Sequence, residues 1–191
     1  MIRFPLRRLA LAALLIGLAA AAPAQAPVSP ARAAFRPYFE QRWVAGTPVT
    51  VAQVRRMIAG HGATWAVQHL AAGDSPNGWD SVTRGIASGA QAWLDLAPVI
   101  GTGTDAATAE VYAMALSDAL IGNAAGVLQL IGDGGDFALC QENGIETEPA
   151  HARAYYAAAI EAVEAVRAPA LQEARSACLA RLRDAAGAPA E

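Results

Sequence analysis

The residue types that most often carry out catalysis occur in this sequence without the surroundings that catalysis requires. A serine nucleophile needs an activating base and an oxyanion site, and none of the serines lies in a G-x-S-x-G context. Carboxylates that could pair for acid–base work are scattered over several expected helices. Among them, Asp95 and Asp118 lie at the edges of apolar stripes, where we expect solvent-facing or capping roles. The sequence therefore predicts no catalytic residue, and we expect a protein that is not an enzyme.

The histidines and acidic residues give little support for a metal site. His61 and His69 flank one short expected helix, so they do not share a face. Glu148 and His151 have the E-x-x-H spacing of carboxylate-bridged di-iron bundles, but such bundles need two of these motifs and two further glutamates. The long segment 132–148 is acidic, yet its spacing is not that of an EF-hand, and we expect a solvated loop. We predict no metal, no cofactor, and a surface position for His151.

Cys140 and Cys178 are the two cysteines of the chain. In an exported protein a single pair usually forms a disulfide, and the absence of a C-x-x-C motif favours a structural bridge over a redox centre. Such a bridge would tie the loop 132–148 to the last helix. The alternative is a pair of free buried thiols.

Residues 1–26 have the organisation of a cleaved secretory signal peptide. Three arginines precede a short apolar run, and A-x-A motifs allow cleavage after Ala24 or Ala26. The apolar run is too short for a comfortable membrane span, which needs about 20 residues. We therefore expect no transmembrane helix in the mature chain. The general secretory route fits better than twin-arginine export, and we expect a periplasmic or secreted protein.

The charge of the mature chain narrows the range of partners. The full 191 residues carry 14 basic and 17 acidic side chains, and removal of the three signal arginines leaves 11 basic residues and a net charge of −6. An acidic chain without a basic stripe argues against nucleic acid and against anionic membrane surfaces. It fits a basic protein or peptide partner.

Most of the chain has the apolar periodicity of helices. We expect a flexible linker over 27–34, one all-helical domain over 35–186 and a disordered tail over 187–191. No segment shows the alternation of β-branched residues that is typical of a strand. Helices are predicted at 48–60, 63–72, 78–88, 90–100, 105–121, 124–131 and 149–168, with a last helix from 171. The predicted core comprises Trp65, Trp79, Val82, Ile86, Trp93, Leu96, Leu116 and Leu120.

Two all-α architectures fit these helices. The helix pairs that begin near 50, 78 and 105 have almost constant spacing, which is the layout of a HEAT-like stack of short helical hairpins. The alternative is an irregular helical bundle. In both, a long C-terminal helix pair closes the domain.

The first aromatic segment has two interpretations. Phe35, Tyr38, Phe39 and Trp43 recur at helical spacing with charged residues between them. They could cover one end of the helical domain, or they could form a partner-binding surface, because aromatics and Arg are common interface anchors.

Our functional expectation is an exported, non-enzymatic helical protein that binds a protein or peptide partner in the bacterial envelope. A basic partner fits the charge, and an inhibitor or immunity-type role is one version of this hypothesis. The alternative is a periplasmic carrier of a small molecule or lipid, with the tryptophans at 65, 79 and 93 lining its cavity.

Overall fold

The computed structural model describes residues 28–74, 76–144 and 147–187, and every regular element in these ranges is a helix. The expected signal peptide and the last four residues of the expected tail lie outside the described residues. The helices are α1 (Pro30–Arg42), α2 (Val51–His61), α3 (Ala63–Ala71), α4 (Gly78–Ala87), α5 (Gln91–Leu94), α6 (Ala97–Gly101), α7 (Ala106–Gly132), η1 (Phe137–Leu139), α8 (Pro149–Glu164), η2 (Pro169–Leu171) and α9 (Gln172–Gly187).

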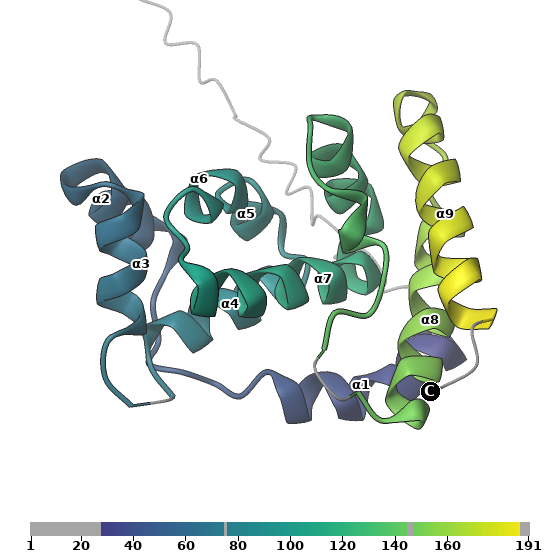
Figure 1. The fold of residues 1–191 in the computed structure, drawn as a ribbon, viewed down its shortest axis with the longest axis horizontal. Helices are drawn as coiled ribbons and strands as arrows, with labels where there is room; N and C mark the ends of the chain where they lie inside the picture. Colours follow the sequence, from purple (N-terminus) through teal and green to yellow (C-terminus); the bar gives the residue numbers. More distant parts are fainter. Residues whose placement is uncertain (1–27, 75, 145–146, 188–191) are drawn as a thin grey trace, which may run out of the picture.

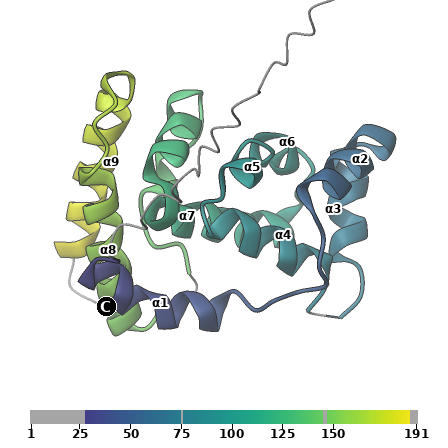
Figure 2. The same cartoon turned by 180° about the vertical axis from the view of Figure 1, so that it is seen from behind.

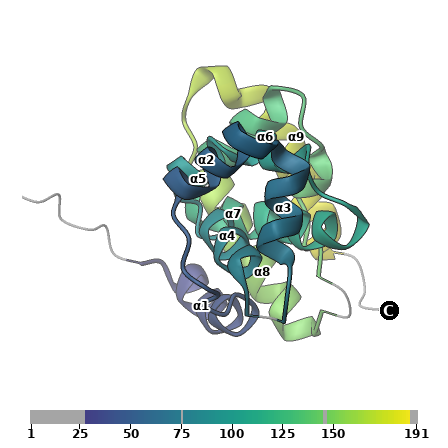
Figure 3. The same ribbon diagram turned by 90° about the vertical axis from the view of Figure 1, so that its left-hand side faces the viewer.

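α7 is the helix around which the others pack. It contacts α4 on one side and α8 and α9 on another, and it lies in the middle of the molecule in both views (Figures 1 and 2). α8 and α9 stand side by side at one end as the expected C-terminal pair, and α2 and α3 form the opposite end (Figures 1 and 2). Figure 3 views the molecule from the end formed by α2 and α3. The all-α prediction and the C-terminal helix pair are confirmed.

Long-range packing favours the irregular bundle over the HEAT-like stack. α1 packs along α8, although more than a hundred residues separate the two helices in the sequence. In a solenoid, each repeat contacts only its neighbours in the chain. The contact between α1 and α8 does not fit that arrangement, because it joins the first third of the domain to the last third.

The start of the domain lies earlier than we predicted. The segment 27–34 is not a linker throughout, because α1 begins at Pro30. Ser29 caps the helix by accepting a hydrogen bond from the backbone N–H of Arg32 at 3.2 Å. Proline at the first helical position costs no hydrogen bond, and the alanines that follow favour helix. The sequence therefore carried a start signal ahead of the aromatic residues.

Six of the eight predicted core residues are buried, and the two exceptions are tryptophans. Trp79, Val82, Ile86, Leu96, Leu116 and Leu120 are each at most 6% exposed. Trp93 is half-buried and packs closely over Gly85. The core assignment of Trp65 is wrong, because its side chain is 41% exposed. α3 buries Ala66, Val67 and Leu70, and Trp65 lies outside that face.

α7 joins the two helices that we predicted at 105–121 and 124–131. The predicted break is present as a kink, because Asn123 has the non-helical dihedral angles φ −152° and ψ 72°. Its side chain accepts a hydrogen bond from the N–H of Gly126 at 3.0 Å and donates to the carbonyl of Gly89 at 3.1 Å. Asp105 is the N-cap of α7, and its side chain accepts a hydrogen bond from the backbone N–H of Thr108 at 3.0 Å. The helix is long and apolar enough to cross a membrane, but 67% of its most apolar stretch is buried, as in a core helix.

The predicted helix at 90–100 is two shorter ones, α5 and α6. The break follows Leu94, and Pro98 occupies the second position of α6. Proline has no N–H to donate, so at the start of a helix it removes no hydrogen bond. Inside a continuous helix over 90–100, Pro98 would remove one backbone hydrogen bond.

The crossing of α4 and α7 gives a stability prediction. A Cβ added at Gly122 would clash with the carbonyl oxygen of Ser88 at the end of α4. We expect Gly122→Ala to lower the free energy of unfolding by about 1–3 kcal/mol, because backbone atoms must move apart. Gly60→Ala on α2 is the matched control: nothing lies within 4 Å of its added Cβ, so alanine should be neutral or stabilising by up to about 1 kcal/mol. Urea denaturation of both variants tests this, and equal stabilities would contradict it.

Candidate functional site

A buried cluster of charged side chains joins α1, α7 and α8. Arg42, at the end of α1, donates to Glu142 with 2.7 Å between Nη2 and Oε1, and its Nη1 lies 3.5 Å from Oδ1 of Asp118. The side chains of Asp118 and Glu142 are only 1% and 5% exposed. Trp43 donates its indole N–H to Oδ2 of Asp118 at 2.7 Å. One arginine thus balances two buried carboxylates.

The two carboxylates are held in different protonation ranges. Burial raises the pKa of Asp118 to about 6, against the opposing effects of Arg42 and Trp43. Burial also raises the pKa of Glu142, but hydrogen bonds from Thr147 and Arg42 have the larger combined effect and bring it below the ordinary value. The backbone N–H of Gly144 adds bonds of 3.0 Å to both oxygens of Glu142. Glu142 therefore stays ionised more readily than Asp118.

His151 completes the cluster from α8. Its ring stacks on Tyr38 with 4.8 Å between centroids, and its Nδ1 lies 3.4 Å from Nη2 of Arg42. Burial and the charge of Arg42 lower its pKa. The predicted surface position of His151 is wrong, because the residue is only 9% exposed. The solvent-facing or capping role predicted for Asp118 is also wrong, because Asp118 is 1% exposed. Residues far apart in the sequence meet here, and no local pattern marks them.

The cluster is better suited to holding helices together than to binding a partner. Phe35 and Trp43 are 3% and 4% exposed, so these two cannot form the exposed partner-binding surface that we predicted. Tyr38 and Phe39 are half-buried, and the guanidinium of Arg84 lies 5.6 Å from the Phe39 ring centroid. The aromatic face of α1 serves mainly to pack the helix against the domain.

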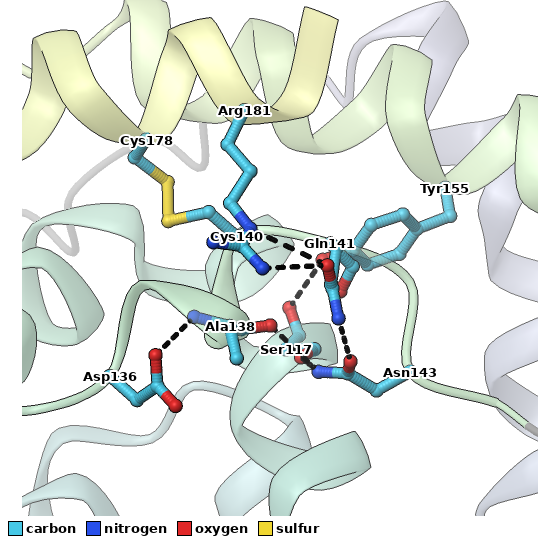
Figure 4. Close-up of a disulfide and its surroundings, with 9 residues drawn as sticks. All are labelled: Ser117, Asp136, Ala138, Cys140, Gln141, Asn143, Tyr155, Cys178 and Arg181. Atoms are coloured by element: carbon cyan, nitrogen blue, oxygen red, sulfur yellow. Dashed lines mark hydrogen bonds between the residues drawn. A yellow bond between two sulfur atoms is a disulfide. The ribbon is translucent and has the colours of Figure 1, made fainter. Parts of the chain in front are cut away.

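The disulfide anchors the loop that carries Glu142. Cys140 and Cys178 are bonded, with 5.3 Å between their Cα atoms, and join the loop to α9 (Figure 4). Beside the bridge, the guanidinium of Arg181 donates to Oε1 of Gln141 at 3.2 Å. The hydroxyl of Tyr155 donates to the carbonyl of Gln141 at 3.1 Å. The predicted bridge is confirmed, and it indicates an oxidising compartment outside the cytoplasm.

An open, largely apolar groove lies between α6 and both halves of α7. It consists of two adjoining hollows of about 400 and 230 Å³, which share Pro98, Leu130 and Asp133. The larger hollow reaches the glycine-rich turn after α7, and the smaller one runs along α5. We call the two together the α7 groove. Its apolar lining is formed by Leu94, Pro98, Tyr112, Leu116, Leu130 and Leu139.

Every charged side chain that lines the described α7 groove is acidic. Asp133 and Asp136 line the larger hollow, and Asp95 lines the smaller one beside Asp133. Asp95 accepts a bond of 2.8 Å from the amide of Gln91, and Asp136 one of 2.8 Å from the N–H of Ala138. Asp133 makes no side-chain hydrogen bond or ion pair within the described residues. This groove was not among our predicted sites.

The end of α7 makes the groove more negative. The C-terminus of a helix carries a partial negative charge, which natural helices commonly offset with Lys, Arg or His in the last turn. The last turn of α7 has no basic residue, and its C-cap is Asp133. A carboxylate at a helix C-terminus is unfavourable by roughly 0.3–1 kcal/mol. The pattern of a long helix ending in Leu-Ile-Gly-Asp is visible in the sequence and could have marked the groove.

Compared with known proteins, the chain matches no protein-family model, no curated protein and no solved structure.

The remaining expected sites do not come together. His69 stacks on Trp65 with 4.6 Å between ring centroids, and the ring of His61 lies tilted against the same indole at 4.1 Å. Within the described ranges, no three His, Cys, Asp or Glu side chains are grouped as metal ligands would be. Trp65 is exposed, Trp79 is buried, and neither these two nor Trp93 lines the α7 groove.

Proposed function

We propose that this chain is an exported, non-enzymatic protein that binds a basic segment of a protein or peptide partner in the α7 groove. The observation that carries the proposal is the unbalanced negative charge around an apolar lining at the end of α7. Three carboxylates and a helix C-terminus line its two adjoining hollows, and no basic side chain of the described chain lines either one.

The chemistry of the groove indicates what the bound segment contains. A Lys or Arg side chain near Asp133 and Asp136 would supply the positive charge that the end of α7 lacks. Apolar side chains next to that residue would cover Leu130, Leu116 and Pro98. Buried apolar area contributes most of the affinity in such grooves, while charge complementarity steers the approach and selects the partner.

The compartment fits this proposal. The disulfide, together with the signal-like first 26 residues, supports a periplasmic or secreted location. There the partner would be an envelope or secreted protein. An inhibitor or immunity-type protein that neutralises a basic effector is the specific version of this function that fits an acidic groove.

Synthetic peptides provide a direct test. We expect short peptides that place Arg or Lys between Leu or Phe residues to bind, and peptides with Glu in place of the cation not to bind. Isothermal titration calorimetry should show weaker binding at higher salt, because the carboxylates are exposed. In the double variant Asp133→Asn with Asp136→Asn, affinity should fall by about tenfold, which corresponds to about 1.4 kcal/mol.

Two controls separate this effect from misfolding. Asp184→Asn, on an exposed position of α9, removes a charge far from the groove and should leave affinity unchanged. Asp133→Asn should also unfold at the same or a slightly higher temperature, because it removes a carboxylate from a helix C-terminus. Equal binding of the Glu peptides, or unchanged affinity in the double variant, would refute the proposal. Capture from the envelope fraction of the host, compared between wild type and double variant, would then identify the natural partner.

A further inference from the structure

A second hollow lies on the other face of α7, beneath α1. It has a volume of about 260 Å³ and is open to solvent between α1, the end of α4 and the middle of α7. Most of its lining is apolar, and two arginines of α1 belong to it. Its lining residues are Arg32, Phe35, Arg36, Phe39, Ala87, Ser88, Asp118, Ile121 and Gly122. We call it the α1 hollow.

The open charge of the α1 hollow is positive. Arg32 and Arg36 lie one turn apart on α1, both are exposed, and neither forms an ion pair with the described residues. Two guanidinium groups on one helical face can hold a carboxylate through paired N–H donors. Glu40, one turn further along α1, is attracted by the charge of Arg36 but forms its ion pair with Arg84 at 2.8 Å.

The one carboxylate of the hollow is already compensated from its inner side. Oδ2 of Asp118 accepts the indole N–H of Trp43, and Oδ1 faces Arg42 at 3.5 Å. With 1% of its side chain exposed, Asp118 offers little surface to a ligand. Asp118 is therefore too buried and too well paired to bind a cation in the hollow. Its negative charge still weakens the binding of an anion there.

We propose that the α1 hollow binds a small apolar carboxylate, with its anionic group on Arg32 and Arg36 and its body against Phe35, Phe39 and Ile121. The volume is just below the ~300 Å³ at which ordinary ligand pockets begin, so the ligand is small. The half-buried ring of Phe39 offers flat apolar surface, which suits an aromatic or short aliphatic body.

Acidification should strengthen this binding. Burial raises the pKa of Asp118 to about 6, so this carboxylate is ionised at neutral pH and mostly protonated near pH 5. The groups that face it are Arg42 and Trp43 from α1, Glu142 from the loop and Tyr155 from α8. A bound anion and an ionised Asp118 repel each other. Loss of that charge between about pH 7.5 and about pH 5.5 should increase affinity several-fold.

Two probes of nearly equal size and opposite charge test the proposal. Phenylacetate should bind the wild-type protein in a calorimetric or NMR titration, and phenethylamine should not. Arg36→Gln should weaken phenylacetate binding by about tenfold. Arg55→Gln is the matched control, because Arg55 is an exposed arginine on α2, at the other end of the molecule. NMR shifts should be confined to α1, the end of α4 and the middle of α7.

Each other result would overturn the proposal. Stronger binding of phenethylamine would make Asp118 the dominant charge, and equal loss in the Arg36 and Arg55 variants would indicate non-specific attraction. Asp118→Asn should remove the pH dependence of phenylacetate affinity, and if this variant does not fold, the pH titration of the wild type alone still decides. Binding of basic peptides uses the separate α7 groove, so failure of one proposal leaves the other unaffected.

Discussion

Replacement of Arg42 by methionine is expected to destabilise the protein by about 3–5 kcal/mol, the usual cost of removing one member of a buried ion pair. Methionine keeps much of the apolar stem of arginine and removes the charge. Asp118 and Glu142 would then lie at 1% and 5% exposure without a cation. The indole of Trp43, the hydroxyl of Thr147 and the N–H of Gly144 would be their main remaining donors.

A surface pair in the same chain serves as the control. Arg183 pairs with Glu164 at 2.6 Å, but these side chains are 57% and 46% exposed. Exposed pairs contribute at most about 1 kcal/mol, so Arg183→Met should change the unfolding free energy by no more than that. If both substitutions have equally small effects in urea denaturation, the buried cluster does not hold α1 in place.

The pH dependence of this difference follows from the three titrating groups. Asp118 has a pKa raised to about 6, so it binds protons more readily in the folded state, and its contribution to stability grows as pH falls through that range. Glu142 and His151 have lowered pKa values, so their contributions are lost as pH falls. Without Arg42, the pKa values of both carboxylates should rise. The deficit of Arg42→Met should therefore be largest near neutral pH and shrink toward pH 5, and a constant deficit would contradict this account.

Loss of the disulfide is the second large effect we expect. The bridge closes a loop with a sequence separation of 38 residues. In the chain-entropy account, a loop of this length contributes about 4 kcal/mol by restricting the unfolded chain. The double variant Cys140→Ala with Cys178→Ala should lose about that much in urea denaturation, and reduction of the wild type should give a similar loss.

The loop should loosen locally as well. Hydrogen exchange is expected to rise first around Gln141 and Asn143. Their hydrogen bonds to the helices are those from Tyr155 of α8 and Arg181 of α9 and the one to Ser117 of α7 (Figure 4). Because Glu142 lies in this loop, the buried cluster should weaken with it. A loss below about 1 kcal/mol would mean that these hydrogen bonds hold the loop without the bridge.

The positions of most helices could be predicted from the sequence because the signals are local. Apolar spacing along 78–88, Pro149 at the start of α8 and Asn123 at the kink act within a few residues of the backbone. The errors have local causes too. The Ser-Pro start of α1 was overlooked, and Trp65 was taken as core although other residues of α3 form the buried face.

The candidate sites could be predicted less well because they are made by packing. In the sequence, Asp118 lies at the edge of an apolar stripe, which predicts exposure to solvent. In the structure, Arg42 and Trp43 pack against it, and its carboxylate is buried and paired. The sequence allowed Phe35 and Trp43 either to cover one end of the domain or to form a partner-binding surface. Both are buried in the structure, where α1 packs on α8. The acidic residues at the end of α7 were visible in the sequence, but the groove forms only where α5, α6 and η1 add apolar side chains to those of α7.

By itself, then, the sequence determined the helical class, the single cysteine pair, the signal-like start and the acidic balance. These properties depend on composition and on short-range periodicity, which the chain carries whatever its tertiary fold. The tertiary structure alone decided which charges are buried, where apolar surface stays open and which face of α1 points inward. Burial and pKa depend on neighbours that are distant in sequence, and a single sequence does not record which of its helices will meet.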